Sequence, residues 1–567
     1  MATRTARRPA RRKRQATEQV RRISLPRVDQ FRDGRLRSAG ALGIIHMGNA
    51  STDKPIVHPA PHEKIKTIEE LGAIARAAQA EGRTVALCHG VFDLVHLGHV
   101  RHILAARNEA DVVIVTVTAD RFVNKGPGRP IFPESMRAEM LAALGTVDWV
   151  GINQTSSAEP ILDTVRPDIY VKGSDYENPE DDVTGKIATE RDAVERHGGR
   201  IVFTRDVTFS SSSLMNRYFD IYDPPLRDYL QKVRESGGAE RLLKLIDKIQ
   251  DMHVVLVGDT IIDEYQYVTA LGKASKENIV ATLFKNGEQF AGGVIAAANH
   301  VASFCKSVEI VTTLGGKDYP EEFIRAHVRP NVTLTPIRIQ GRPTTRKLRY
   351  VELGYLHKLF EVYTMDDTPL DEAERKEIDR ITAERVRGGD VVIVTDFGHG
   401  MIAPSTIDAL IANSKFLAIN AQSNSGNHGY NLITKYPRAD YICIDAPEAR
   451  LAATDKFSDI ASVIETSLHG KIDCDNMIIT HGSFGCYPFS SKTGVARVPA
   501  FTKTVVDTVG AGDAFLTITA PLVAAGGNIE DVAFIGNAAG AIKVGIVGHR
   551  NSVEKAPLVK FVTALLK

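Results

Sequence analysis

The sequence predicts a mixed α/β protein in which two parallel sheets, each covered by helices, follow one another along the chain. At 567 residues the chain exceeds what a single hydrophobic core usually supports. Short apolar runs of strand length alternate with helix-compatible stretches, a pattern typical of parallel sheets with covering helices. The hydrophobic content of 43% and the charged content of 25% are those of an ordinary globular protein.

Residues 1–60 form a basic segment that we expect to be a disordered tail. Residues 1–37 hold twelve Arg and one Lys against three acidic residues, so their charge of +10 leaves −9 for the rest. Such a tail can contact nucleic-acid or membrane phosphates, but a solvated tail is the simpler interpretation, and no specific nucleic acid partner is predicted. Arg21-Arg22 and the Arg-rich opening resemble an export signal or a transit peptide, but the segment that follows is poorly apolar.

Cysteine content and hydropathy predict a cytoplasmic protein. No run of 18 or more apolar residues occurs, so a membrane span is not expected. The number of cysteines is odd and no CxxC pair is present, which argues against a disulfide framework or structural zinc. The cysteines are Cys88, Cys305, Cys443, Cys474 and Cys486.

The first predicted domain, residues 64–218, alternates between strands and helices. We expect helices at 65–80, 98–107, 135–144, 186–197 and from residue 213, and strands at 85–88, 112–117, 149–152, 169–171 and 201–204. Ligands of such a sheet bind beyond the carboxyl ends of its strands.

A polar stretch at 219–250, with Pro224-Pro225 near its start, is predicted to be a linker. The second domain is expected at 251–567. Its apolar strands are predicted at 253–258, 391–395, 417–419, 441–444 and 477–480.

The first domain carries a phosphate-handling motif just after its first strand. Gly90 permits a tight turn, and His96 and His99 flank Gly98 where the next helix begins. A helix N-terminus favours phosphate, and two imidazoles three residues apart can stabilise charge during nucleotidyl transfer. The alternative, that both histidines are metal ligands or ordinary polar residues, is less consistent with the intervening glycine. His89 and His102 are expected to be structural.

A second motif lies at 507–513, where a glycine-containing loop leads into a helix. Backbone N–H groups of Gly510, Ala511 and Gly512 can converge on an anion. Asp513 at the same helix start can accept the proton of a sugar hydroxyl that attacks the γ-phosphate of ATP. The carboxylate makes a kinase the favoured interpretation.

Residues 90–99 resemble the signature of the cytidylyltransferase-like nucleotidyltransferases, in particular those of bifunctional ADP-heptose synthesis, over roughly 64–218. The resemblance implies a Rossmann-like HxGH nucleotidyltransferase domain. It implies phosphate or nucleotide binding by Gly90, Phe92, His96, His99, Lys125, Ser211 and Ser212, with His96, His99 and Lys125 catalytic. Further substrate or nucleotide contacts would be Asp93, Lys172 and Asp175.

The second domain resembles the ribokinase-like sugar kinases, which implies an α/β domain with a small β lid near 265–283 and 347–356. Asp513 would be the catalytic base, and Gly510, Ala511 and Gly512 the anion hole. Nucleotide-binding residues would be Thr480, Gly482, Gly485 and Asn537. Substrate-binding residues would be Asp259, Asp263, Gly292, Gly293, Lys273, Lys347 and Arg349, and Asp445 and Glu448 would help organise Mg²⁺.

Several positions depart from the heptose kinases. Asn420-Ala421-Gln422 replaces an Asp-Pro-Lys element of those kinases. Asp445 and Ala296 each replace an asparagine, and Lys273 replaces an arginine. A lysine loses the bidentate recognition of phosphate that an arginine offers. Domain order is also reversed, because the heptose enzymes place the kinase first. These changes bear on the sugar more than on the reaction.

The two motifs together predict a bifunctional enzyme, a Mg²⁺-dependent sugar or sugar-phosphate kinase fused to a sugar-1-phosphate nucleotidyltransferase that uses ATP or CTP. By resemblance the leading product is ADP-heptose or a related nucleotide sugar, and a separate phosphatase would act between the two steps. One alternative is a cytidylyltransferase that makes a CDP-polyol beside a kinase for another sugar. Another is a second domain that only binds or scaffolds. A homo-oligomer is left open.

Overall fold

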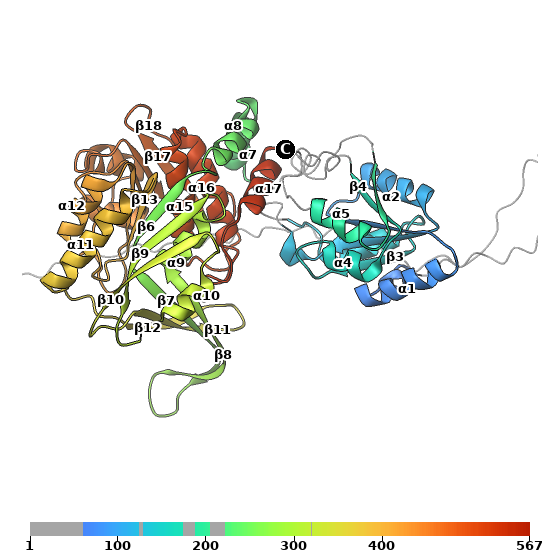
Figure 1. Cartoon of the computed structure of the whole chain (residues 1–567), viewed down its shortest axis with the longest axis horizontal. Helices are drawn as coiled ribbons and strands as arrows, with labels where there is room; N and C mark the ends of the chain where they lie inside the picture. Colours follow the sequence, from blue (N-terminus) through green and yellow to red (C-terminus); the bar gives the residue numbers. More distant parts are fainter. Residues whose placement is uncertain (1–59, 124–128, 174–186, 205–221, 319) are drawn as a thin grey trace, which may run out of the picture. The chain divides into compact units, whose positions relative to one another are not determined.

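The computed structural model describes residues 60–123, 129–173, 187–204, 222–318 and 320–567. These form a front domain and a back domain, each with its own central sheet (Figure 1). The mixed α/β class predicted from the sequence is confirmed. Among the described helices, none has the length and apolar character that a membrane crossing needs.

The front domain is built on a five-stranded parallel sheet in the order β3-β2-β1-β4-β5. Every predicted strand is present, within two residues of its expected ends. The strands are β1 (Val85–Gly90), β2 (Val112–Thr118), β3 (Trp149–Asn153), β4 (Ile169–Gly173) and β5 (Arg200–Thr204). The chain reverses its direction of travel across the sheet between β1 and β4, so the ligand crevice is expected there.

In the described part of the front domain, five α-helices cover this sheet: α1 (Ile68–Ala80), α2 (Leu97–Glu109), α3 (Glu134–Ala142), α4 (Glu159–Val165) and α5 (Ile187–Glu195). Helix α1 begins three residues later than predicted because Thr67 and Glu70 form a capping box at its start. Helix α4 was not predicted, since seven residues give too short a periodic signal. The helix expected from residue 213 lies outside the described residues.

The back domain has a nine-stranded sheet in the order β10-β9-β6-β13-β14-β15-β16-β17-β18. The pairs from β10 to β16 are parallel and the last two are antiparallel. The strands are β6 (His253–Gly258), β9 (Ser307–Gly315), β10 (Val332–Ile339), β13 (Val391–Asp396), β14 (Leu417–Ala421), β15 (Tyr441–Asp445), β16 (Asn476–Thr480), β17 (Cys486–Ser490) and β18 (Gly494–Val495).

Successive side chains of these strands enter opposite cores. Val254 and Leu256 pack with the helices of one face, whereas Val255 and Val257 pack with those of the other. The first face is covered by α7 (Pro224–Glu235), α8 (Gly238–Asp247), α9 (Val294–Val301), α15 (Ala511–Ala524), α16 (Ile529–Lys543) and α17 (Lys555–Leu566). The second is covered by α11 (Glu372–Val386), α12 (Pro404–Asn413), α13 (Ala446–Ala453) and α14 (Ile460–Val463). Helix α10 (Glu321–His327) follows β9.

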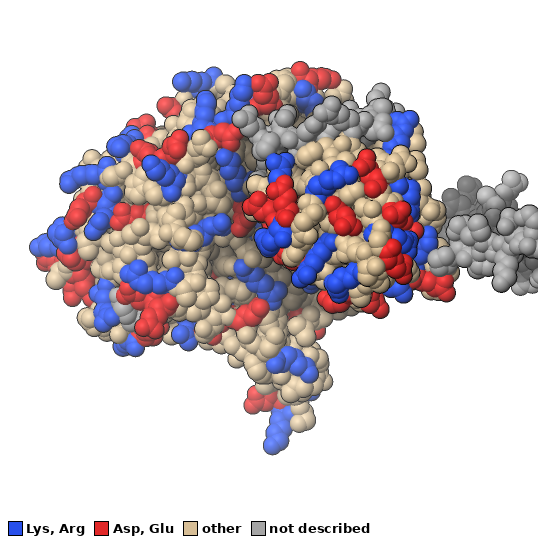
Figure 2. All heavy atoms as spheres, turned by 45° about the vertical axis from the view of Figure 1, so that its right-hand side comes forward, with Lys and Arg blue, Asp and Glu red and all other residues tan. Residues whose placement is uncertain are grey.

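A separate four-stranded sheet corresponds to the expected lid. Its order is β12-β11-β7-β8, with β7 (Thr260–Lys273), β8 (Val280–Gly293), β11 (Thr345–Glu352) and β12 (Lys358–Thr364). The β7–β8 hairpin projects from the domain and is mostly uncharged along its length (Figures 1 and 2). Leu271, Val280 and Phe284 are exposed on it.

The described part of the segment expected as a linker, residues 222–250, contains α7 and α8 and packs into the core of the back domain. Leu230 and Leu242 are fully buried, with Leu226, Leu245 and Ile246 nearly so, in the same core as α15 to α17. The Pro-Pro pair that suggested a connector occupies the first turn of α7, where proline is well tolerated. The polar residues between these leucines face solvent. They make the segment polar on average, so its composition does not reveal the apolar face.

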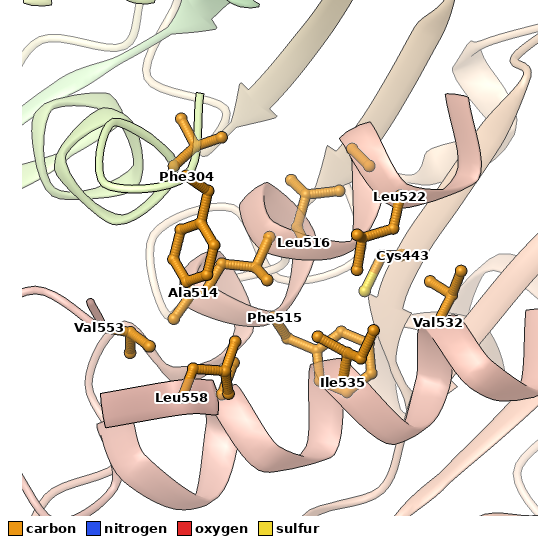
Figure 3. Close-up of a cluster of buried hydrophobic side chains, with 14 of the residues drawn as sticks. Phe304, Cys443, Ala514, Phe515, Leu516, Leu522, Val532, Ile535, Val553 and Leu558 are labelled. Atoms are coloured by element: carbon orange, nitrogen blue, oxygen red, sulfur yellow. The ribbon is translucent and has the colours of Figure 1, made fainter. Parts of the chain in front are cut away.

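Helix α15 is held in place by close packing against α16. Phe515 and Leu522 of α15 belong to the same buried cluster as Val532 and Ile535 of α16 (Figure 3). A Cβ on Gly536 would lie 2.5 Å from Cζ of Phe515, whereas one on Gly540 would lie 4.0 Å from its nearest neighbour. The missing side chain at position 536 therefore sets the helix separation.

We predict that Gly536→Ala lowers the free energy of unfolding of the back domain by about 1–3 kcal/mol, because the added methyl group overpacks the contact with Phe515. Gly540→Ala in the same helix is the control, and helix propensity gives it a gain of up to about 1 kcal/mol. Urea unfolding followed by circular dichroism measures both. Equal effects of the two substitutions would contradict this packing role.

Candidate active sites

The front site lies beyond the carboxyl end of β1, where α2 begins. His96 is the N-cap of α2, and its Nδ1 accepts the N–H of Gly98 at 3.1 Å. The backbone N–H of His96 donates to Nδ1 of His99 at 3.4 Å. The two rings lie 4.0 Å apart between centroids. The structure thus brings the predicted histidine pair together at a helix N-terminus, where an anion is favoured.

Phe92 and Gly90 shape the turn before the histidines. Phe92 has a left-handed φ of 50°, and its ring lies 5.1 Å from that of His99. A Cβ on Gly90 would come within 3.2 Å of the Phe92 ring, so a side chain there would crowd this contact. Both residues shape the turn that leads to the histidine pair.

Two of the predicted contact residues are engaged within the protein. Asp93 is fully buried, and its Oδ1 accepts the N–H groups of Ile131 at 2.6 Å and Phe132 at 3.3 Å. Lys172 pairs with Glu190 at 2.6 Å. Lys125, Asp175, Ser211 and Ser212 lie outside the described residues.

Arg137 and His102 support this site from within the fold. The guanidinium of Arg137 is fully buried and donates to the carbonyls of Val91 at 2.5 Å and Thr118 at 2.7 Å. Burial lowers the pKa of His102 to about 4, and Lys172 adds to the shift. The ring is therefore neutral at neutral pH, which agrees with the structural role expected for it. No sequence signal identified Arg137, because arginine is usually exposed.

In the back domain the predicted anion hole is the start of α15. Gly510 is the N-cap with φ of 74°, and a Cβ there would lie 2.6 Å from Cε1 of His549. Both the backbone and the close imidazole therefore require glycine. Around Gly512 a Cβ would meet no atom within 4 Å, which leaves space next to the helix start.

Asp513 lies in the first turn of α15 and is 7% exposed. Burial raises its pKa to about 6, although His549, Lys543 and Lys347 oppose the shift. A carboxyl group with a pKa near the working pH is well suited to general base catalysis.

Asp263 is buried beside Arg349 and His549. It pairs with Arg349, and its Oδ2 lies 3.4 Å from Nε2 of His549. Burial alone would raise the pKa of Asp263, but His549 and Arg349 hold it at about 2. A Cβ on Gly292 would lie 2.0 Å from Oδ2 of Asp263, which explains the glycine at this position.

Asp259 lies beyond the carboxyl end of β6, where the order of the large sheet reverses toward β13. It accepts the N–H groups of Phe397 at 3.2 Å and His399 at 3.3 Å. Burial and the nearby Asp396 raise its pKa to about 7. A Cβ on Gly293 would lie 2.4 Å from the Asp259 carbonyl, so the second glycine of the pair is also required by close approach.

The three predicted phosphate-binding cations have different environments. Lys347 on β11 is 5% exposed, lies 5.1 Å from the Tyr363 ring and makes no salt bridge in the described part of the chain. Arg349 pairs with Asp263 and, at 3.2 Å, with Glu361. Lys273 lies at the exposed end of β7, ten residues after Asp263, and an extended strand separates such residues by roughly 30 Å. The structure therefore does not bring Lys273 to the site.

Asp445 and Glu448 form the capping box of α13. The Glu448 N–H donates to Asp445 and the Asp445 N–H to Oε2 of Glu448, both at 2.8 Å. Oε1 of Glu448 accepts the N–H of Ser423 at 3.0 Å. Burial and the neighbouring Asp445 raise the pKa of Glu448. Each carboxylate oxygen of Glu448 thus accepts one backbone N–H. The described residues contain no cluster of three or more metal-ligating side chains.

The predicted nucleotide residues surround the end of β16, where Thr480 is the last residue. Gly482 and Gly485 have φ of 52° and 93°, and a Cβ on Gly485 would lie 2.0 Å from the Val498 carbonyl. Asn537 of α16 donates to the Pro499 carbonyl at 3.1 Å. The two glycines and Asn537 therefore fix one loop.

Asp507 was part of the predicted motif but had no assigned role. It accepts Tyr265 Oη at 2.7 Å, Lys358 Nζ at 2.6 Å and the N–H of Gly548 at 2.8 Å. Despite burial, these donors, with Lys358 the largest, hold its pKa at about 2. Only the three-dimensional structure shows this cluster.

The departure at 420–422 covers the last two residues of β14 and the start of an asparagine-rich loop near the end of β13. Asn420 donates to the Cys443 carbonyl at 2.8 Å. Asn424 and Asn427 donate to the Phe397 carbonyl at 2.8 and 2.9 Å, and Asn431 to that of Asp396 at 3.0 Å. The loop fixes the 396–399 segment whose N–H groups bind Asp259. Ala296, the other departure, is buried in α9.

Two family models match the chain, one over the back domain and one over the front domain. The model described as pfkB family carbohydrate kinase matches residues 251–556, more than half of the chain, and the one described as cytidylyltransferase-like matches 87–217. The chain therefore belongs to the pfkB family of carbohydrate kinases. The cytidylyltransferase-like match precedes the kinase match, a domain order that differs from that of the curated relatives.

Curated relatives include the bifunctional protein HldE of Syntrophotalea carbinolica, 37% identical over 163 residues, which are 28% of this chain and 32% of that protein. HldE of Gluconobacter oxydans is 34% identical over 191 residues, 32% of this chain and 38% of that protein. The chain thus spans about a third of the length of the curated relatives it matches.

Among solved structures, ribokinase of Thermotoga maritima is 20% identical with a TM-score of 0.44, covering 55% of this chain and 99% of its own. Phosphofructokinase-2 of Escherichia coli is 14% identical with a TM-score of 0.45, covering 56% of this chain and all of its own.

Proposed function

We propose that the chain is a bifunctional transferase. The back domain would transfer the γ-phosphate of ATP to a sugar or sugar phosphate, and the front domain would couple a sugar 1-phosphate to a nucleotide and release pyrophosphate. The observation that carries the proposal is the pair of helix starts: α15 with Asp513 buried beside the anion-hole glycines, and α2 with its adjacent histidines. The similarity to HldE favours ADP-heptose or a related nucleotide sugar as the product.

In the proposed kinase step Asp513 accepts the proton of the attacking hydroxyl. The N–H groups at the start of α15 stabilise the negative charge of the transferred phosphoryl group. Lys347, which has no carboxylate within salt-bridge distance in the described structure, is our candidate for a phosphate already on the sugar. Mg²⁺ would neutralise the ATP phosphates when bound, and Asp445 is the residue we propose to hold it, with Glu448 fixing the loop.

In the proposed nucleotidyl transfer the substrate phosphate is itself the nucleophile, so the domain needs to position and stabilise charge. His96 and His99 would donate to the phosphates at the start of α2. We include Lys125, Ser211 and Ser212 among the phosphate ligands on the motif resemblance alone.

The wider setting is also proposed. A cytoplasmic location is supported by five cysteines that are buried and unpaired and by nucleotide substrates. Acidic and basic side chains are intermixed on the face shown in Figure 2, which does not favour a nucleic acid partner. Exposed apolar side chains on the β7–β8 hairpin support a homo-oligomer, and the heptose route would need a separate phosphatase.

The first experiment is pyrophosphate release by the full chain with ATP or CTP against a panel of sugar 1-phosphates. We expect release with ATP and heptose 1-phosphate. Release only with CTP and another substrate would favour the alternative product, a CDP-polyol or CDP-sugar. The cytidylyltransferase-like match is consistent with this alternative.

We predict that Asp513→Asn abolishes phosphorylation and spares nucleotidyl transfer, because the amide cannot accept the hydroxyl proton. His96→Asn should do the reverse, since asparagine keeps an N-cap acceptor for α2 but lacks the imidazole. Both activities are measured on each variant, with circular dichroism as a control for folding. Loss of both activities in either folded variant would refute independent sites.

The raised pKa of Asp513 predicts the pH dependence of the kinase. The base acts as a carboxylate, so kcat/KM should fall as the pH drops through about 6, approaching a tenfold loss per unit below it. Initial rates from acid to neutral pH measure the profile. A profile that stays flat down to the ordinary range of an aspartate, about pH 4, would contradict this assignment.

A further inference from the structure

Lys543, the last residue of α16, has an unusual environment for a lysine. Its side chain is fully buried, with 0% exposure. Nζ donates to the Val509 carbonyl at 2.7 Å and to the Gly548 carbonyl at 2.8 Å. No carboxylate lies within salt-bridge distance of it in the described part of the back domain. The ammonium thus binds two loop carbonyls.

Removing an ammonium from water costs several kcal/mol unless the surroundings compensate. Here the compensation is the two carbonyl dipoles and the more distant carboxylates of Asp507, Asp513 and Asp263. Burial, with Lys358 adding to it, lowers the pKa of Lys543 to about 8, and those carboxylates limit the shift. The side chain is therefore still mostly charged at neutral pH.

The two bound carbonyls belong to the loops that build the anion hole. Val509 immediately precedes Gly510, the N-cap of α15. Gly548 immediately precedes His549, whose ring lies against Gly510, and its N–H donates to Asp507. Lys543 therefore joins the loop before α15 to the loop after α16.

Because the peptide unit between Val509 and Gly510 is planar, holding its carbonyl also orients its N–H group. The carbonyl of Val509 and the N–H of Gly510 belong to one peptide unit and point in opposite directions. With the carbonyl held on Lys543, the N–H of Gly510 is turned to the other side of the loop. A rotation of this peptide would move an N–H group of the anion hole.

We infer that Lys543 is a positioning residue of the kinase, whose buried ammonium fixes the 509–510 peptide so that the anion hole is pre-organised for the transferred phosphoryl group. The inference rests on the proposed kinase function. A purely structural role would affect the stability of the fold in general. The proposed positioning role instead predicts a specific effect on the binding and transfer of the γ-phosphate.

The test compares Lys543→Met with the wild-type chain. Methionine has a similar length without the charge. We expect kcat of phosphorylation to fall about tenfold to a hundredfold, with KM for the sugar nearly unchanged. This is less than the roughly hundredfold to thousandfold loss that follows removal of an oxyanion-hole donor, because the variant displaces the N–H group without removing it. Added ammonium or methylammonium should restore part of kcat in the variant, whereas sodium at equal ionic strength should not. Lys306→Met, at an exposed lysine of the same domain, is the matched control.

Calorimetry separates this inference from the kinase proposal, because it needs no turnover. Lys543→Met should weaken the binding of ATP and leave that of ADP nearly unchanged. If the wild type phosphorylates no sugar, the kinase proposal fails while the ATP-to-ADP comparison still tests Lys543. An unchanged ATP-to-ADP preference in the folded variant would overturn the inference. If Lys543→Met does not fold, Lys543→Gln, which retains N–H donors, replaces it with a smaller expected loss.

Discussion

The carboxylate of Asp507 connects the small sheet of the back domain to the loops around α15. Tyr265 and Lys358 reach it from the small sheet, and the N–H groups of Val509 and Gly548 reach it from the loops around α15. Hydrogen bonds to a buried carboxylate are strong, and each unpaired atom would be costly. A change in the lid therefore acts on the anion hole through one side chain.

Charge balance is the second constraint on this region. Asp263, Asp507 and Asp513 are all buried there, and Arg349, Lys358, Lys543 and His549 surround them. Asp263 and Asp507 are held ionised by direct cationic partners, whereas Asp513 has none within salt-bridge distance in the described structure and keeps a raised pKa. Two of the three carboxylates are thus held ionised, whereas the raised pKa of Asp513 leaves it able to exchange a proton.

The sequence predicted the sheets well because buried parallel strands are continuous apolar runs, such as the one that became β13. It also predicted the pairing of His96 with His99, since residues three apart at a helix start share a face. The sequence could not predict the partners of Asp507, because Tyr265 and Gly548 are separated in sequence by more than half of the back domain. Lys543 resembled an ordinary lysine near a helix C-terminus, where lysines are common and usually exposed. Lys273 was placed in the site by motif position alone, and strand length separates it from Asp263.

The helices α7 and α8 also determine where the chain can be divided. Their leucines fill the core formed with α15 to α17, and Arg234 of α7 donates to the Leu565 carbonyl near the end of α17 at 3.0 Å. A fragment that started at β6 would leave an apolar groove along α17 open to water. We therefore expect a stable back-domain fragment to need residues from Pro224 on, well before the first strand of its own sheet.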